Sequence, residues 1–463
     1  MKSILKTTSV LALAGAMALP VLADDTTSTD AKDQKDLKKV IEDQGINYVE
    51  TAQKGITLSG YVDTSYTEQF GGRGTAFTSN QAYLHQFDVN NNNFNVNAVK
   101  IALEKALPDK NEWAAGFRID TMYGQDAKIL TASDPVLGSA GSSVYLEQAL
   151  VKFRIPVGNG LDVYMGKFVT FLGYEVIESP ANLNFSRGLL FTNAIPLTHT
   201  GIYVDYKFND TFEAKFGIVD GWNQSASTPN TATGVGFPNG TDAKNDYPFG
   251  GKAITGQFTI NAPGKNANLT QSFIYSPSGE PANFTAISGS SLVPSGTPDN
   301  RDNGPLVVYD VWGNWNPTFV KDSALTLGFN IDLGYNGASG LPVNSIYPGG
   351  GGTGFSFFHN EDSNTWWGAA LYASYKLTKV VTLSSRGEYL HEDPAFNAKF
   401  GVAGVNNDDW SETLTASFSI WDNLLTRVEY RYDYLVEPNT AATGGPAVHT
   451  NQDEVSVEAV YSF

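Results

Sequence analysis

The sequence predicts an all-β protein: a transmembrane up-and-down antiparallel β-barrel of about 16 strands, preceded by a short N-terminal periplasmic arm. Three observations predict it. Apolar residues recur at every second position from Ile56 onward, short and long connections alternate along the chain, and after the first residues no apolar run reaches the roughly 18 residues of a membrane-spanning helix. Hydrophobic residues make up only 41% of the chain. The prediction therefore depends on their spacing.

Residues 1–23 form a predicted signal peptide. Lys2 and Lys6 precede an apolar stretch over residues 10–19, and Val21 and Ala23 follow at the spacing that a signal peptidase reads. Without these 23 residues the chain holds 28 basic and 48 acidic residues, a formal charge of −20. This sign argues against a nucleic-acid partner, since phosphate binding needs basic residues. The chain has no cysteine, so disulfides cannot stabilise the exported protein.

Residues 24–54 are charged and polar, and they differ from the rest of the chain. Leu37, Val40 and Ile41 have helical spacing, but only over little more than one heptad. An isolated helix of this length is marginal, so we expect a flexible periplasmic arm with one short helix. The alternative, an oligomerising coiled coil, requires three or four heptads.

The barrel is predicted over residues 55–463. Two-faced strands, apolar on one side and polar on the other, are evident at residues 56–62, 202–208, 212–218, 325–331, 414–420 and 428–434. A barrel of about sixteen such strands has a lumen too wide to be filled by side chains alone, which predicts an aqueous channel.

The connections distinguish a barrel from a soluble sandwich. Short turns are predicted near residues 108–111, 156–160, 209–210, 263–266 and 421–423, and long loops near 123–143, 173–197, 222–250, 277–303 and 437–450. Alternation of this kind is typical of hairpins that cross a membrane, whereas Greek-key crossings in a sandwich give no such regularity. Near residues 85–100 and 304–323 the pattern does not define where the strands begin and end. An even strand number places both chain ends on the short-turn side.

The final residues, 453–463, are predicted to close the barrel. Val455, Val457, Ala459, Tyr461 and Phe463 occupy alternate positions, so they face the outer-membrane lipid together. Backbone groups in lipid must all be paired, so the last strand must meet the first. Tyr461 and Phe463 are expected in the aromatic girdle at the membrane surface.

A terminal Phe with an aromatic residue two positions earlier resembles the signal read by the barrel assembly machinery of the bacterial outer membrane. The segments 59–66, 145–175, 179–206 and 386–393 are similar to the putative beta-barrel porin type 2 family, most specifically in the GKF, GYE and NFSRG stretches. The resemblance covers the chain from about residue 56. It implies a passive outer-membrane channel and provides no residue roles.

The loop at residues 173–197 is the candidate constriction, because its charged and amide side chains suit a segment folded into a lumen; an ordinary external loop is the alternative. Its place, third among the long loops, is analogous to the inward-folded loop of general porins. The predicted pore-lining and constriction residues are Arg118, Asp120, Lys152, Arg154, Glu175, Glu178, Arg187, Arg386, Glu388, Arg427, Glu429 and Arg431.

The predicted function is passive diffusion of small hydrophilic solutes and ions with a modest cation preference. Lumen faces of mixed sign favour neither ion, so the acidic surplus is assigned to the loops and the arm, where it attracts cations until salt screens it. A saccharide-selective pore is an alternative, because polar strand faces carry three tyrosines on which sugar rings could stack, Tyr61, Tyr164 and Tyr203. A barrel that acts as an adhesin or an enzyme through its long loops is a second alternative. The five histidines lack metal-ligand spacing, so no catalytic, cofactor or metal site is predicted. Homo-oligomerisation is left open.

Overall fold

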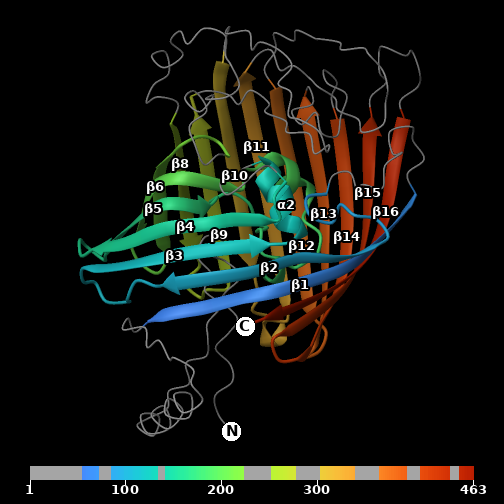
Figure 1. The fold of residues 1–463 in the computed structure, drawn as a ribbon, viewed down its shortest axis with the longest axis horizontal. Helices are drawn as coiled ribbons and strands as arrows, with labels where there is room; N and C mark the ends of the chain where they lie inside the picture. The colour runs from blue at the N-terminus through green and yellow to red at the C-terminus, as the bar shows by residue number, and fades with distance from the viewer. Residues whose placement is uncertain are drawn as a thin grey trace, which may run out of the picture.

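The computed structural model describes residues 55–71, 85–133, 141–223, 252–277, 303–338, 364–393, 407–437 and 448–463. Over these ranges the chain forms sixteen strands: β1 Ile56–Gly71, β2 Asn93–Lys105, β3 Ala114–Tyr123, β4 Val144–Ile155, β5 Leu161–Val169, β6 Thr198–Lys207, β7 Phe212–Val219, β8 Ala253–Asn261, β9 Ala267–Ser276, β10 Asn303–Trp315, β11 Leu325–Ala338, β12 Asn364–Lys376, β13 Val381–Asp393, β14 Asn407–Trp421, β15 Leu424–Glu437 and β16 Val448–Ser462. All are antiparallel to their neighbours in one closed barrel, as predicted (Figure 1).

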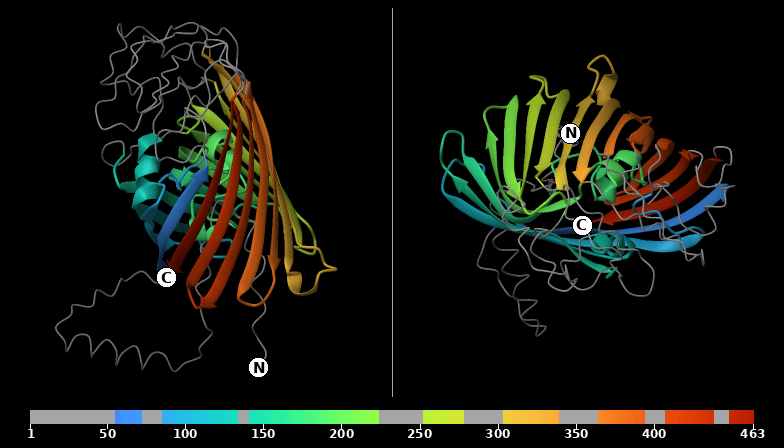
Figure 2. Two further views of the ribbon diagram at one scale, coloured as in Figure 1. Left: turned by 90° about the vertical axis from the view of Figure 1, so that its right-hand side faces the viewer. Right: turned by 90° about the horizontal axis from the view of Figure 1, so that it is seen from above.

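The barrel closes where the last strand meets the first, as Figure 2 shows from two further directions. β16 pairs with β1 in a register that places Val62 opposite Tyr461. Beyond the end of β16, Gly60 and Phe463 exchange backbone hydrogen bonds of 3.0 Å. A Cβ atom on Gly60 would lie 2.1 Å from the Lys100 carbonyl oxygen and 2.8 Å from the Phe463 ring, so this position needs glycine. The closing role predicted for the final strand is confirmed.

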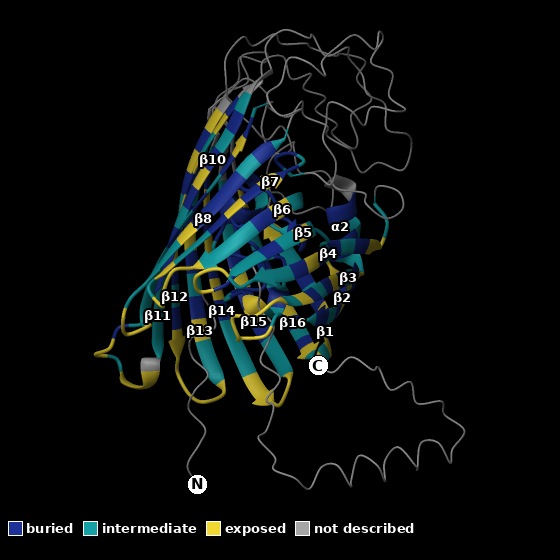
Figure 3. Ribbon diagram, turned by 90° about the vertical axis from the view of Figure 1, so that its left-hand side faces the viewer, coloured by how far each residue is buried: buried dark blue, intermediate teal, exposed yellow. Residues whose placement is uncertain are grey.

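The period of two separates an apolar outer surface from a polar interior, and Figure 3 shows the alternation of buried and exposed residues along the strands. Leu58, Met165 and Leu371 are 60–69% exposed on the outside. Tyr461 and Phe463 are about half exposed there, and Val460, directly before Tyr461 on the opposite face of the strand, is buried. The expected two-faced strands are therefore present.

The strands differ in length around the barrel. β5, β7 and β8 have 8 or 9 residues, whereas β11, β14 and β16 have 14 or 15. In Figure 1 the strands β2 to β5 lie closer to the horizontal than β10 to β16. A helix that the sequence did not predict, α2 (Gln125–Ser133), lies in the long loop between β3 and β4. In the described part of the chain no helix is long and apolar enough to cross a membrane.

The predicted signal peptide at residues 1–23 and the predicted arm at 24–54 lie outside the described residues. The same applies to most acidic loop positions to which the sequence assigned the negative surplus, such as Asp242, Asp299 and Glu361. These assignments stay predictions.

Candidate functional site

The third loop, residues 170–197, runs from β5 into the interior of the barrel. Its chain turns at Gly173, whose φ of 95° is accessible to glycine without strain. Just before this turn the Phe171 carbonyl oxygen accepts hydrogen bonds of 2.8 Å from Gln257 of β8 and Ser272 of β9. The loop therefore contacts strands well beyond its own hairpin, on their inner faces.

Tyr174 attaches the loop to the next three strands. Its backbone N–H donates to Asn330 of β11 at 2.9 Å, and its hydroxyl donates to Asn314 of β10 at 2.7 Å. Its ring stacks on Tyr372 of β12 with a centroid distance of 4.1 Å. Polar and aromatic contacts together place this part of the loop on the lumen wall.

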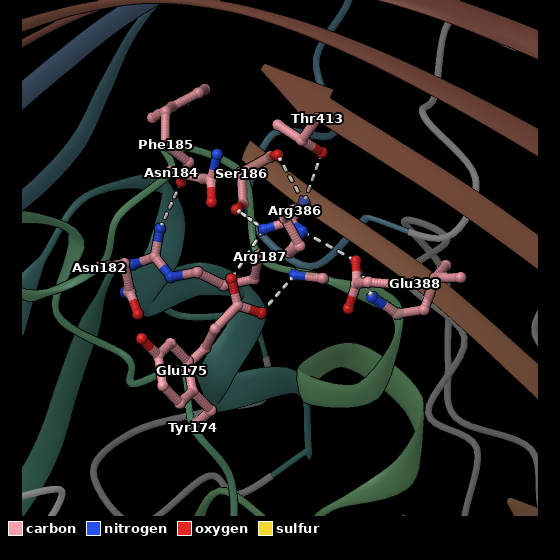
Figure 4. Close-up of polar contacts among 12 residues, drawn as sticks. Tyr174, Glu175, Asn182, Asn184, Phe185, Ser186, Arg187, Arg386, Glu388 and Thr413 are labelled. Carbon is pink, nitrogen blue, oxygen red and sulfur yellow. Dashed lines mark hydrogen bonds and ion pairs between the residues drawn. The ribbon is translucent and has the colours of Figure 1, made fainter. Parts of the chain in front are cut away.

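Arg386 of β13 is the centre of a polar cluster between the lumen wall and the third loop (Figure 4). Its guanidinium donates to the Glu175 carboxylate at 2.7 Å, to the Ser186 carbonyl at 2.6 Å and to the Thr413 hydroxyl at 2.9 Å. Its Nε lies 2.8 Å from the Glu388 carboxylate. A planar cation with five donors suits this position, because it binds a carboxylate and a carbonyl at once.

Carboxylates on the same wall accept the backbone N–H groups of the loop. Glu429 of β15 accepts from Phe185 at 2.6 Å and from Ser186 at 2.9 Å, and Glu388 accepts from Leu189 at 3.2 Å. These buried amides lie outside any ladder and need partners elsewhere. Hydrogen bonds to an ionised acceptor are stronger than neutral ones, so the acidic side chains fix the path of the loop.

Arginines on β15 bind the loop carbonyls in the complementary way. Arg427 donates to the Asn182 carbonyl at 2.6 Å and to the Ser179 carbonyl at 3.1 Å. Arg431 donates to the Arg187 carbonyl at 2.7 Å. The basic side chains that the sequence assigned to the pore lining thus hold the loop on the wall.

Arg187 itself closes the loop on its own backbone. Its guanidinium donates to the carbonyls of Val176, Ile177 and Phe185. The residue is 2% exposed. Its charge therefore acts mainly within the loop.

A second cluster surrounds Lys100 of β2. The Lys100 ammonium contacts Glu147 at 2.9 Å, Asp120 at 3.3 Å and also Glu178 of the third loop. Burial alone would raise the pKa of Glu178, but the charge of Lys100 and its hydrogen bond dominate and lower it from 4.5 to about 2. Glu178 is therefore ionised and attaches the third loop to this wall.

Further pairs extend this second cluster along β2 to β4. Arg118 lies 2.9 Å from Asp120 and 3.2 Å from Glu104, and Lys152 also contacts Glu104. Here the charged side chains bind each other, and backbone groups of the loop are not their partners in these contacts.

Arg154 lies apart from both clusters. Its guanidinium makes two hydrogen bonds of 2.6 Å to Asp162 across the β4–β5 hairpin, and it also donates to the Pro108 carbonyl of a short turn. It belongs to the short-turn end of the barrel.

The predicted residues thus divide into three sets. The first is Glu175, Arg187, Arg386, Glu388, Arg427, Glu429 and Arg431; the second is Arg118, Asp120, Lys152 and Glu178; the third is Arg154 alone. Sequence reasoning missed Lys100, Glu104 and Glu147. Lys100 and Glu104 alternate with Val99, Ile101 and Leu103, and this alternation could have placed both charged residues on the lumen face. They were missed because the strand boundaries near residues 85–100 were not assigned.

The tyrosines considered for sugar stacking are mostly covered. Tyr164 and Tyr203 stack on each other across β5 and β6, with a centroid distance of 4.4 Å and an interplanar angle of 6°. Tyr61 is 5% exposed. These ring faces contact protein, which argues against their use as a sugar-binding surface.

The balance of buried charge differs from the sequence-based expectation. Sixteen Asp and Glu residues against nine Lys and Arg residues are buried among the described residues. Part of this excess comes from β10, β11, β14 and β16, which bring buried carboxylates such as Asp310, Asp332, Asp409 and Glu454 without a buried base. The predicted surplus in the arm and in most of the loops lies outside the described residues, so that assignment stays a prediction.

Solved structures share this fold at low sequence identity. The outer membrane channel DcaP of Acinetobacter baumannii has a TM-score of 0.52 at 11% identity, covering 90% of this chain and 99% of that chain. OmpF of Salmonella typhi, in complex with daunomycin, has a TM-score of 0.53 at 10% identity, covering 88% and 97%. An anion-selective porin of Comamonas acidovorans has a TM-score of 0.50 at 13% identity, covering 88% and 99%. No curated protein sequence matches the chain.

The profile of one protein family matches residues 55–463, the whole of the predicted barrel. That family is described as putative beta-barrel porin-2, OmpL-like. The match agrees with the resemblance noted in the sequence, with the closed sixteen-stranded barrel and with the fold of the outer-membrane channels named above. The chain belongs to the putative beta-barrel porin-2, OmpL-like family and is a porin channel of the outer membrane.

Proposed function

We propose that this porin lets small hydrophilic solutes and ions diffuse passively and prefers cations modestly. The observation that carries the ion preference is the excess of sixteen buried Asp and Glu residues over nine Lys and Arg residues. A channel wall of one net sign raises the local concentration of counter-ions.

The arrangement of the basic residues supports the same sign. Arg386, Arg427 and Arg431 are each paired with a carboxylate, Glu175, Glu458 and Asp433 respectively, so each pair carries no net charge and the remaining carboxylates make up the surplus. Asp310 of β10 lies opposite Asp332 of β11 in the ladder, and both are buried. Asn330 donates to both carboxylates, at 2.6 and 3.5 Å, so the partner of this acidic pair is an amide and not a base.

Reversal potentials across a KCl gradient test the ion preference. We expect a cation-selective potential at low salt that decreases toward zero as ionic strength rises, since the Debye length falls from about 10 Å at 0.1 M to about 3 Å at 1 M. A clear chloride preference at low salt would overturn the proposal, and would mean that basic residues such as Arg118 and Lys152 dominate the narrowest part.

The third loop is proposed as the constriction. Its attachment to β8 through β15 on one side, and to Lys100 of β2 on the other, supports a position across the lumen. Swelling of liposomes in sugars of increasing size measures the cut-off. Swelling with one sugar alone would favour a saccharide-selective pore, and swelling with none would favour an adhesin or an enzyme acting through the long loops.

We also propose that Phe463 is read by the barrel assembly machinery and that residues 1–23 direct export. Phe463 is half exposed at the end of the closing strand, which supports this role. Deleting Phe463 should reduce the amount of heat-modifiable barrel in the outer membrane while leaving the exported pool unchanged. Equal assembly of both forms would count against this role.

A second copy of the chain is the proposed partner of the wall with short strands. β7 has 8 residues, about 26 Å even without tilt, so when tilted it falls short of an apolar band of about 25 Å. Met165 of β5 and Leu371 of β12 are both exposed, and the chain has no natural cysteine. Met165→Cys should yield dimers with a short bis-maleimide in native membranes, whereas Leu371→Cys should not. Equal yields would argue for a monomer.

A further inference from the structure

A compact group of metal-ligand side chains lies where the first long loop returns to the barrel. The Nδ1 atom of His85 contacts the Asp88 carboxylate and lies 3.5 Å from the Glu454 carboxylate of β16. One ligand atom of each of these three residues lies within 4.8 Å of the other two. All three residues are buried, with exposed fractions of 4% or less.

The opposite nitrogen of the same ring is held separately. His85 Nε2 lies 2.7 Å from the Asp433 carboxylate of β15. Metal-bound histidines usually donate their other N–H to a carboxylate in this way, which orients the ring and makes the ligating nitrogen more basic. The direction of the ring therefore turns Nδ1 toward two carboxylates at once.

One oxygen of this group has no partner that the structure records. Asp88 Oδ1 is buried and accepts no hydrogen bond from a donor in the described ranges, although the other oxygen of the same carboxylate contacts His85 and the carboxylate also lies within hydrogen-bonding distance of Glu454. An unpaired buried carboxylate oxygen is costly. A cation between Nδ1 and the two carboxylates would satisfy it.

A second acidic group clarifies why the first is the better candidate. Asp120, Glu147 and Glu178 also lie within 4.8 Å of one another, but the Lys100 ammonium already contacts all three. At His85 the imidazole itself lies among Asp88, Asp433 and Glu454, whose charges raise its pKa, and Arg431 pairs with Asp433 at 2.9 Å. Unlike the Lys100 ammonium, an imidazole becomes a metal ligand when a cation displaces its proton. Three carboxylates, one guanidinium and one divalent cation beside the resulting neutral imidazole carry no net charge.

We propose that His85 Nδ1, Asp88 and Glu454 bind one divalent transition-metal ion of the Zn²⁺ class, with Asp433 orienting the imidazole from Nε2. One nitrogen and two carboxylate oxygens suit Zn²⁺, which accepts imidazole and carboxylate ligands, whereas Mg²⁺ and Ca²⁺ prefer oxygen throughout. The described ligands leave a fourth position for Asp88 Oδ1 or for water.

The position gives the site a mechanical consequence. Phe87, between two of the ligands, lies under the Arg187 guanidinium at 4.9 Å and 6.2 Å from the Phe191 ring, both in the third loop. A bound cation fastens the end of the first long loop to β16, with Phe87 held against the third loop. Occupancy of the site therefore stabilises both loops.

Zn²⁺ titration of the full-length porin in detergent, with excess Mg²⁺ present to saturate non-specific acidic sites, tests the proposal. We expect one equivalent of Zn²⁺ to bind per chain and to raise the thermal unfolding midpoint. His85→Gln and Asp88→Asn should each weaken binding at least about tenfold, and Asp433→Asn about tenfold through loss of orientation.

His391 provides a matched control, because its Nδ1 contacts one carboxylate, Asp408, at 2.8 Å. His391→Gln should bind Zn²⁺ like the natural chain. A heat-dependent gel shift identifies variants that keep the barrel. Absence of stoichiometric binding by the natural chain, or equal affinity of folded His85→Gln, would overturn the site and would leave a histidine that serves only as an ion-pair partner.

Discussion

The two charged walls of the lumen use the same residue types for different purposes. On β13 and β15, Arg386, Arg427 and Glu429 bind backbone groups of the third loop. On β2 to β4, the partners of Arg118 and Lys152 are other side chains. The first wall is thus a binding surface for backbone groups of the third loop, and the second is a network of paired side chains that meets the loop at Glu178.

Charged side chains inside the barrel therefore have two different roles, to hold the third loop or to set the local electric field. A charge bonded to the loop determines where the loop lies, so its loss should change the pore and the stability together. A charge paired within the strands determines the local field, so its loss should change ion flow with a smaller effect on stability.

The largest effect is expected from removing the part of the loop that the first wall binds. Deleting residues 181–187 eliminates the Asn182, Phe185 and Ser186 contacts and should raise single-channel conductance several-fold. Planar bilayer recordings measure it, with heat-dependent gel mobility as the check that the barrel still forms. Unchanged conductance would place the narrowest part elsewhere.

Replacing one arginine of the first wall should lower the free energy of unfolding more than replacing one lysine of the second. Arg386→Met leaves the buried Glu175 and Glu388 without their base and should cost about 3–5 kcal/mol. Lys152→Met leaves Glu104 with Arg118 and should cost about 1–2 kcal/mol. Urea unfolding in detergent measures both. Equal costs would remove the distinction between the two walls.

A pH series tests the ion pair between Glu178 of the third loop and Lys100 of the second wall. Because the pKa of Glu178 is lowered from 4.5 to about 2, its ionised form stabilises the fold above pH 4.5, and this contribution is lost as pH falls toward 2. Glu178→Gln should therefore lower the thermal midpoint most at pH 5–7. The difference from the natural chain should shrink to nothing near pH 2, and a constant difference across the series would contradict the ion pair with Lys100.

Arg154→Gln should have the smallest effect. Its pair with Asp162 lies at the short-turn end and touches neither cluster nor the third loop in the recorded contacts. We expect unchanged conductance and at most about 1 kcal/mol of lost stability, as is usual for a partly exposed ion pair. A conductance change as large as that of the loop deletion would show that the pore narrows at this end.

Much of the fold could be predicted because strands carry local information. Alternation places Arg427, Glu429 and Arg431 on one face, and all three are buried in the structure. The short-turn and long-loop pattern predicted the hairpins, and the terminal alternation predicted the β1–β16 closure. Helix α2 was missed because a segment of nine residues inside a long loop has too short a pattern to stand out.

By itself the sequence determined the strand period, the barrel, the lumen face of each clear strand and the identity of the closing strand, since all of these follow from side-chain alternation between near neighbours. Only the tertiary structure decided the partners. Arg427 meets Asn182 across 245 positions of sequence, and His85 meets Glu454 across 369. Such pairs depend on barrel closure and on the path of loops through the lumen, and spacing along one strand contains no information about either.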